Sequence, residues 1–129
     1  MKSSDLLLCR TVGEPLASAL EVRTPRGALH RGAVVMWRPS EAGPAAAFGA
    51  GKIERCYQLR DAQGADVYVV VATEWRLVSL ENSPTTSTFS LQACFKAVVL
   101  ASNVFYKPAY IIDGTAGTIL RPSLWRRLL

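Results

Sequence analysis

The side chains best able to perform chemistry in this chain are few and lie far apart in the sequence. There are three cysteines, Cys9, Cys56 and Cys94, and a single histidine, His30. A structural zinc site needs four cysteine or histidine ligands in closely spaced pairs, so this pattern predicts no metal site. The odd number of cysteines indicates a reducing compartment without a disulfide framework. Because each cysteine stands among apolar neighbours, we expect all three to be small buried hydrophobic residues.

The remaining candidates for catalysis are weak. His30 adjoins an arginine, and a neighbouring cation makes a histidine a poorer base. Glu54 and Glu74 could face each other across a hairpin as a pair of carboxylates. Ion pairs with nearby arginines, Arg55 or Arg76, are the more favourable use of both. The sequence also lacks a GxxxxGK phosphate loop. It therefore predicts a protein that is not an enzyme and that needs no cofactor.

Basic residues outnumber acidic ones. Lysine and arginine total 15 against 10 for aspartate and glutamate, which gives a formal net charge of +5. Such a chain attracts nucleic acid or an acidic protein surface, and the same charge can also serve only as a solvated face. Arginine, which supplies eleven of the fifteen cations, suits bidentate contacts with phosphate or carboxylate. The candidates for nucleic-acid binding are Arg23, Arg26, Arg31, Arg38, Lys52 and Arg55.

Period-two alternation of apolar residues dominates the chain, which is typical of strands. The apolar run Leu6–Cys9 is interpreted as a buried strand. Thr24–Gly27 predicts a turn in which proline pre-sets one dihedral angle and glycine tolerates another. A strand is expected at 33–37, where Pro39 stops it, and the segment 40–51 is expected to be a loop rich in glycine, alanine and proline.

The strongest local signal is a long β-hairpin at 51–77. Two strand-forming runs flank the polar turn Asp61–Gly64. The run Val67–Val71 is typical of a central strand that is covered on both sides. Because side chains alternate along a strand, the first arm is expected to place three apolar residues on one face, namely Ile53, Tyr57 and Leu59.

The C-terminal third gives mixed signals. Residues 81–87 read as a polar linker, 89–100 fit either helix or strand, and 109–120 predict two short strands about the turn Asp113–Gly114. Ser123 could cap a short helical turn or tail at 123–129. Many short strands predict a mainly β fold, a small single-domain curved sheet or partly open β-barrel with long loops and at most short helices. One domain should span 1–129.

The order of these motifs resembles that of a bromo-adjacent homology (BAH) domain. The matching segments are GAVVMWRP at 32–39, GKIER at 51–55, the hairpin that ends in Trp75-Arg76, VVLAS at 98–102 and IDG at 112–114. The family shows a G-x-V-x-V opening strand, an I-x-R/K-I strand that enters a long hairpin, a V-F-L-S segment and an I-x-G-K-x-V ending. The resemblance covers about 31–120 and rests on apolar spacing and glycine placement.

The resemblance implies a β-rich chromatin module that binds histone tails or nucleosomes, or that serves as a protein-docking surface. Family members that read methylated lysine hold its ammonium group inside an aromatic cage. Here the candidate walls are Trp37, Tyr57, Tyr68 and Trp75, with Phe105, Tyr106 and Tyr110 as a second group and Glu74 or Asp113 as the acidic partner. After Trp75 the chain lacks the second aromatic residue and the proline of the family pattern. The alternative is that Trp37, Tyr57 and Tyr68 are core aromatics on half-buried strands, and we favour it for most of them.

Two further classes of function stay open. A nucleic-acid-binding barrel would use the arginine-rich face and would lose affinity steeply with added salt. A structural or oligomerisation module of a larger assembly would use exposed apolar residues and would associate in a salt-tolerant way. For that module the candidates are Phe48, Phe105, Trp125 and Leu128. We expect an intracellular protein, nuclear if its source is eukaryotic, with a histone or other protein as partner, or nucleic acid, and with no membrane partner.

Overall fold

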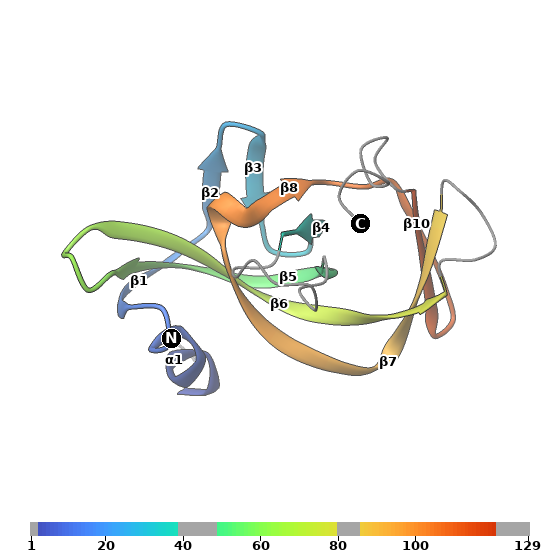
Figure 1. Ribbon diagram of the computed structural model, residues 1–129, viewed down its shortest axis with the longest axis horizontal. Helices are drawn as coiled ribbons and strands as arrows, with labels where there is room; N and C mark the ends of the chain where they lie inside the picture. Colours follow the sequence, from blue (N-terminus) through green and yellow to red (C-terminus); the bar gives the residue numbers. More distant parts are fainter. Residues whose placement is uncertain (1–2, 39–48, 80–85, 121–129) are drawn as a thin grey trace.

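The computed structural model describes residues 3–38, 49–79 and 86–120 as a curled antiparallel half-barrel sheet with one short helix (Figure 1). This confirms the predicted mainly β class. In chain order the elements are α1 (Ser3–Cys9), β1 (Glu14–Ala19), β2 (Glu21–Thr24), β3 (Gly27–His30), β4 (Val34–Trp37), β5 (Gly49–Arg60), β6 (Asp66–Ser79), β7 (Thr86–Leu100), the 3-10 turn η1 (Ala101–Asn103), β8 (Val104–Tyr106), β9 (Tyr110–Asp113) and β10 (Ala116–Leu120).

The main sheet has the strand order β8-β4-β5-β6-β7-β10-β9. Strand β5 connects the two parts of this sheet. One edge of β5 pairs with β6 along the strand, and the other edge pairs with two different strands. Residues 49–52 of β5 pair with β4, whereas residues 56–60 pair with β1. A second, two-stranded sheet consists of the hairpin β2–β3. Between these two stretches, the backbone of Ile53 is hydrogen-bonded to Gly32 and Ala33, in the turn before β4.

The hairpin β5–β6 forms about the predicted turn. Asp61 Oδ1 accepts hydrogen bonds from the backbone N–H groups of Gln63 and Ala65, each at 2.9 Å, and Gly64 adopts a positive φ of 83°. An aspartate side chain that closes its own turn and a glycine in the left-handed region explain why this segment reverses the chain here.

A β-bulge interrupts β5. The register passes from the pair Ile53↔Ala72 directly to Arg55↔Val71, so Glu54 is the extra residue. A bulge reverses the alternation of side chains beyond it. Ile53 therefore packs in a different cluster from Tyr57 and Leu59, and the prediction that these three share a face is wrong.

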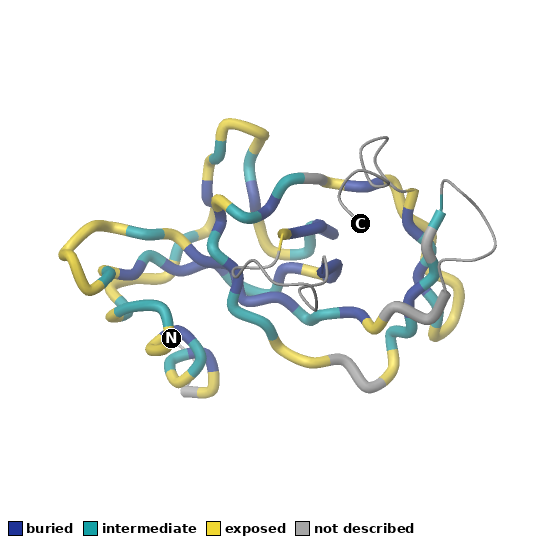
Figure 2. The backbone as a smooth tube through the Cα atoms, viewed as in Figure 1, coloured by how far each residue is buried: buried dark blue, intermediate teal, exposed yellow. Residues whose placement is uncertain are grey.

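Buried residues recur along the long strands (Figure 2). Their apolar side chains form clusters on both faces of these strands. One face carries a cluster that includes Val35, Ile53 and Val70 and lies against the hairpin β2–β3. At one end of the opposite face Tyr57, Leu59, Val69 and Val71 pack with Cys9 of α1. At its other end Met36, Trp75, Phe89 and Ile119 form a third cluster inside the curl. The prediction for Val67–Val71 is confirmed in part: β6 lies between β5 and β7, and Val69, Val70 and Val71 are buried. Val67 is half-buried and Tyr68 is exposed, so this end of the run is not covered on both sides.

Three other sequence predictions meet the structure differently. Leu6–Cys9 is helical and not a strand, because a run of four apolar residues fits either element and the burial of Asp5 and Cys9, four residues apart, matches one helix face. The ambiguous segment 89–100 belongs to β7, which begins at Thr86 inside the expected linker. Phe48 and the proposed turn at 123–129 lie outside the described residues.

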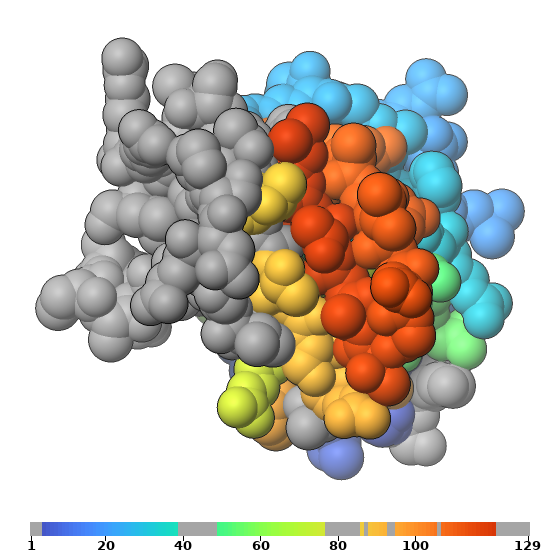
Figure 3. Space-filling view, turned by 90° about the vertical axis from the view of Figure 1, so that its right-hand side faces the viewer, coloured from blue at the N-terminus to red at the C-terminus, as the bar shows by residue number. Residues whose placement is uncertain are grey.

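The turns predicted at 24–27 and 113–114 both join hairpins. Gly27 and Gly114 have φ values of 129° and 59° there. Strand β9 ends the sheet, and β9 and β10, in orange and red, lie at the surface in Figure 3. Within 3–38, 49–79 and 86–120, no helix is long and apolar enough to cross a membrane.

Candidate functional site

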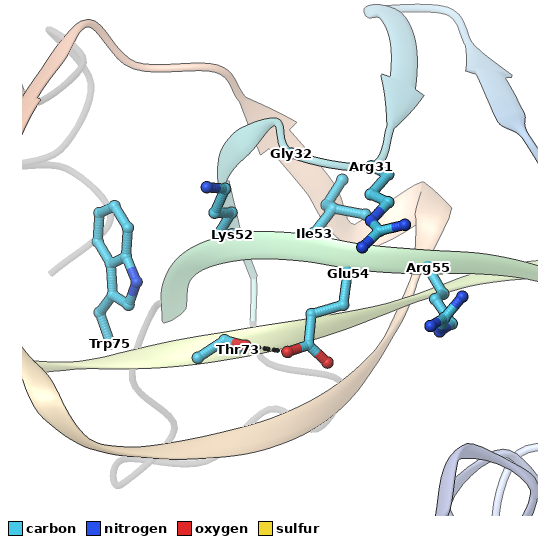
Figure 4. A pocket seen from close by; sticks show the side chains of 8 residues that line it. All are labelled: Arg31, Gly32, Lys52, Ile53, Glu54, Arg55, Thr73 and Trp75. Atoms are coloured by element: carbon cyan, nitrogen blue, oxygen red, sulfur yellow. Dashed lines mark hydrogen bonds between the residues drawn. The ribbon is translucent and has the colours of Figure 1, made fainter. Parts of the chain in front are cut away.

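A cavity of about 600 Å³ lies where β5 passes from β4 to β1. Trp75 and Arg55 mark opposite ends of the row of side chains that lines it, with Lys52, Thr73 and Glu54 between them (Figure 4). The turn before β4 supplies the remaining wall. The lining residues are Arg31, Gly32, Lys52, Ile53, Glu54, Arg55, Thr73 and Trp75. We call this space the basic cavity.

The bulge in β5 determines which side chains reach the basic cavity. Lys52 is paired with Thr73 in the ladder, so the two side chains lie on the same face. Because Glu54 is the extra residue, Arg55 also reaches that face instead of the opposite one. A regular strand would have placed Lys52 and Arg55 on opposite faces. Bulges commonly re-aim side chains in this way beside functional sites.

The carboxylate of Glu54 already has partners within the chain. The hydroxyl of Thr73 donates a 2.7 Å hydrogen bond to Glu54 Oε1, and the ammonium of Lys96 on β7 lies 3.4 Å from Oε2. The Thr73 hydrogen bond, assisted by the charge of Lys96, lowers the pKa of this carboxyl group below its ordinary value. The expected ion pair of Glu54 with Arg55 or Arg76 is therefore wrong, since its partner comes from a strand distant in the sequence.

Asp5 of α1 contacts Arg55, a lining residue of the basic cavity, and is 1% exposed. Its Oδ2 accepts a 2.6 Å hydrogen bond from the Tyr57 hydroxyl and lies 3.7 Å from Arg55 Nε. Its Oδ1 lies 3.6 Å from Lys96 Nζ. Burial and the contact with Asp5 together raise the pKa of Tyr57 to about 12, so this phenol remains a donor at neutral pH.

Two cations of the basic cavity, Arg31 and Lys52, have no acidic partner among the described residues. Neither forms an ion pair with any residue in 3–38, 49–79 or 86–120. Both side chains are exposed, and they reach the basic cavity from different elements. Among the described residues, the ion pairs at this place join Arg55 and Lys96 to the carboxylates of Asp5 and Glu54 and leave Arg31 and Lys52 without one. The surroundings of the basic cavity thus carry an excess of positive charge.

Trp75 forms the apolar wall. Its side chain is 6% exposed and packs against Phe89, with ring centroids 6.4 Å apart and planes tilted by 55°. Because most of the indole is buried in the cluster inside the curl, only a small part of it can contact a ligand. Trp75 is therefore as much a core residue as a wall of the basic cavity.

The four cage candidates are not brought together. Trp37, Tyr57 and Trp75 are buried in three separate clusters, so core positions are confirmed for Trp37 and Tyr57. Tyr68 is 43% exposed, which contradicts its predicted core position; it lines a different cavity beside Pro25 at the end of the hairpin. Glu74 does not line the basic cavity.

The second aromatic group is dispersed as well. Phe105 is half-buried, Tyr110 is 46% exposed on β9, and the side chain of Tyr106 is outside the described set. Asp113, the other acidic candidate, lies on the exposed hairpin β9–β10. Phe105, Tyr110 and Asp113 are not among the residues that line the basic cavity.

The candidate cations divide into groups. Arg31, Lys52 and Arg55 line the basic cavity. Arg26 donates a 3.0 Å hydrogen bond to the carbonyl oxygen of Phe105, and the Arg38 guanidinium carbon lies 5.4 Å from the centre of the Phe105 ring. Arg23 stands apart, with its side chain 88% exposed and 4.0 Å from Glu21.

Sequence reasoning missed Asp5, Thr73 and Lys96. Thr73 and Lys96 are directly paired between β6 and β7, which was not evident while 89–100 could be helix or strand. Asp5 does not stand out as a site residue when Leu6–Cys9, which follows it, is interpreted as a strand. The i, i+4 spacing of Asp5 and Cys9 was the available signal for the helix that buries both.

The described part of the chain contains the side chains of two cysteines, Cys9 and Cys56, and of His30. No group of three histidine, cysteine, aspartate or glutamate residues there could hold a metal ion. Cys9 and Cys56 are buried, as expected, and burial raises the pKa of both thiols. The side chain of Cys94 is not among those described. His30 is exposed, with Nδ1 3.0 Å from the carbonyl oxygen of Arg31.

Comparison with known proteins adds no family to this description. Neither a protein-family model, nor a curated protein, nor a solved structure matches the chain.

Proposed function

We propose that this chain is a non-enzymatic interaction module that binds an acidic segment of a partner protein in the basic cavity. The observation that carries the proposal is the charge of this site. Arg31 and Lys52 have no carboxylate partner among the described residues, while Glu54 is engaged by Thr73 and Lys96. A carboxylate from a partner would complete the two open pairs and could rest against Trp75.

The same charge argues against a methylated lysine as the ligand of the basic cavity. A quaternary ammonium needs aromatic faces around it and benefits from an acidic neighbour. Here a single tryptophan, mostly buried, stands among cations. A chromatin role, which the BAH resemblance suggests, would then rely on an acidic protein surface and not on a basic histone tail.

Nucleic acid is the alternative ligand of a basic surface. A duplex needs cations spread along a track that follows its phosphates. Arg26 and Arg38 are instead directed to Phe105, and Arg23 lies beside Glu21. A confined cavity with an apolar wall suits one or two carboxylates better than a duplex backbone. We therefore favour a protein partner.

Binding to an oligoglutamate peptide, nucleosomes and duplex DNA at low and moderate ionic strength tests this function. We expect the peptide to bind the full chain. Lys52→Gln and Arg31→Gln should each lower the affinity for the peptide about three- to fivefold, the range for a partly exposed ion pair. Arg60→Gln, at the other end of β5, is the matched control because it removes the same charge from an exposed position. It should leave affinity nearly unchanged.

Two outcomes would contradict the proposal. If Arg60→Gln weakens peptide binding as much as Lys52→Gln, the effect is one of net charge and not of the basic cavity. If only DNA binds, with a steep dependence on salt that Lys52→Gln reduces by about one counterion, the nucleic-acid function replaces this one.

A further inference from the structure

A second group of ligands for a carboxylate lies next to the basic cavity. The Tyr57 hydroxyl, Arg55 and Lys96 all approach the carboxylate of Asp5, which α1 inserts between them. Arg55 also lines the basic cavity, and Lys96 is linked to it through Glu54. The two places therefore share Arg55 and are linked by the ion pair of Lys96 with Glu54, and one of them already holds a carboxylate from the chain itself.

Asp5 does not satisfy this second site fully. Charge-assisted N–H···O hydrogen bonds are usually about 2.7–2.9 Å long. Arg55 and Lys96 stand 3.7 Å and 3.6 Å from the Asp5 oxygens. Oδ1 is buried and has no hydrogen-bond partner among the described residues. A buried carboxylate oxygen without a hydrogen bond is costly. A carboxylate that is not constrained by a helix could approach both cations more closely.

The helix that carries Asp5 is held by few contacts. It has seven residues, fewer than a helix needs to persist alone in water. Of its apolar side chains only Cys9 is fully buried, and Leu7 is 67% exposed. Figure 1 shows α1 beneath β1, outside the curl of the sheet. Elements with little buried apolar surface open locally at low free-energy cost.

We propose that Tyr57, Arg55 and Lys96 form a carboxylate-binding site that Asp5 occupies in the free chain and that an acidic partner segment occupies when α1 moves away. The proposal rests on the proposed function, because it extends the basic cavity by a second position for the same acidic segment. Asp5 is then an internal competitor. Its release would leave Arg55 and Lys96 available beside Lys52 and Arg31.

Peptide affinity and amide hydrogen exchange on the full chain test the proposal together. Asp5→Asn keeps the size of the side chain but removes its charge. We expect this variant to bind the oligoglutamate peptide about fivefold more tightly than the unaltered chain, the weight of one ion pair of this kind. In the unaltered chain the peptide should speed amide exchange at residues 3–12 while it slows exchange in β5. The exchange measurement needs no variant and so does not depend on the stability of Asp5→Asn.

Asp113→Asn is the matched control, since it makes the same change of charge on the exposed hairpin β9–β10, on the opposite side of Figure 1 from α1. It should alter affinity far less than Asp5→Asn. Adding Lys96→Gln to Asp5→Asn should remove the gain, because Lys96 is one of the two cations that Asp5 releases.

The failures of the two proposals are distinguishable. The α1 proposal alone would be overturned by the following result. Lys52→Gln weakens peptide binding, but Asp5→Asn does not strengthen it and the peptide does not speed amide exchange at residues 3–12. Binding by Asp5→Asn that depends on Lys96 and is indifferent to Lys52 would support it while overturning the function assigned to the basic cavity. If Asp5→Asn and Asp113→Asn raise the peptide affinity equally and the peptide does not speed amide exchange in α1, the change in affinity is due to net charge. That result would overturn the α1 proposal.

Discussion

At the scale of single residues, the hydrogen bond from Tyr57 to Asp5 couples the stability of the fold to alkaline pH. Burial and the nearby carboxylate raise the pKa of Tyr57 from 10.0 to about 12. Below pH 10 the phenol is protonated in both the folded and the unfolded chain, so its contribution to stability is fully present. Between pH 10 and 12 the unfolded chain loses the proton first, and the contribution is progressively lost.

We expect Tyr57→Phe to lower the free energy of unfolding at pH 8 by roughly 1–3 kcal/mol, because it removes the hydrogen bond that Tyr57 donates to the buried carboxylate of Asp5. The difference from the unaltered chain should shrink as the pH rises from 10 to 12. Urea denaturation over pH 8–12 measures both quantities. Ultraviolet titration should also show one late-ionising tyrosine that the variant lacks.

Tyr68→Phe is the control for this titration, because Tyr68 is 43% exposed and donates no hydrogen bond to a described residue. Its stability should stay within about 0.5 kcal/mol of the unaltered chain. If the gap between Tyr57→Phe and the unaltered chain were constant up to pH 12, the hydrogen bond to Asp5 would not be what holds the phenol protonated.

At the scale of elements, the pairing of β5 with β6 positions the basic cavity, and Gly51 permits that pairing. A Cβ atom added to Gly51 would lie 2.1 Å from the backbone carbonyl oxygen of Thr73. Real Cβ atoms do not approach so closely, and the backbone oxygen cannot swing aside as a flexible side chain can. Any residue other than glycine must therefore push the two strands apart beside Lys52 and Thr73.

We expect Gly51→Ala to lower the free energy of unfolding by roughly 2–3 kcal/mol, the cost of a steric overlap in packed surroundings. It should also lower the affinity for the oligoglutamate peptide by more than the loss of folded protein explains, because Lys52 would shift. Gly117→Ala is the comparison, since its Cβ would meet only the side chains of Leu91 and Trp75, at 3.2 Å and 3.3 Å. Equal losses for the two variants in urea denaturation would contradict this account.

The elements that sequence could predict are those with local causes. The turn Asp61–Gly64 closes through its own side chain and glycine, and the β-branched run Val67–Val71 favours a strand wherever it lies. The bulge at Glu54 has no such local cause. It is visible only in the register between β5 and β6, so Ile53 was assigned to the wrong face.

The site was predictable to the extent that it lies on one hairpin. Lys52, Arg55 and Trp75 lie on the two arms of the predicted hairpin, and they line one cavity once the arms pair about their turn. Asp5 and Lys96 come from α1 and β7, whose positions depend on long-range pairing. Short apolar runs such as Leu6–Cys9 fit helix and strand equally, so the residue that completes the ionic network could not be placed from sequence.

At the scale of the whole molecule, the half-barrel stays open and leaves β9 as an edge strand. All four residues of β9 are exposed, including Ile111 at 72% and Ile112 at 46%. Edge strands usually carry charges, prolines or bulges that prevent pairing with another chain. The apolar sequence of β9 has only Asp113 at its end. Association through this edge is the molecular basis that the fold offers for an oligomerisation module.

We expect Ile111→Lys to leave the free energy of unfolding within about 0.5 kcal/mol of the unaltered chain, because the side chain is mostly in water already. It should nevertheless slow aggregation, measured by light scattering at fixed concentration, because a charge on an edge strand opposes strand addition. Gln63→Lys adds the same charge at the exposed hairpin turn and controls for general repulsion. If both variants slow aggregation equally, net charge governs association; if only Ile111→Lys does so, β9 is the surface through which copies of this chain meet.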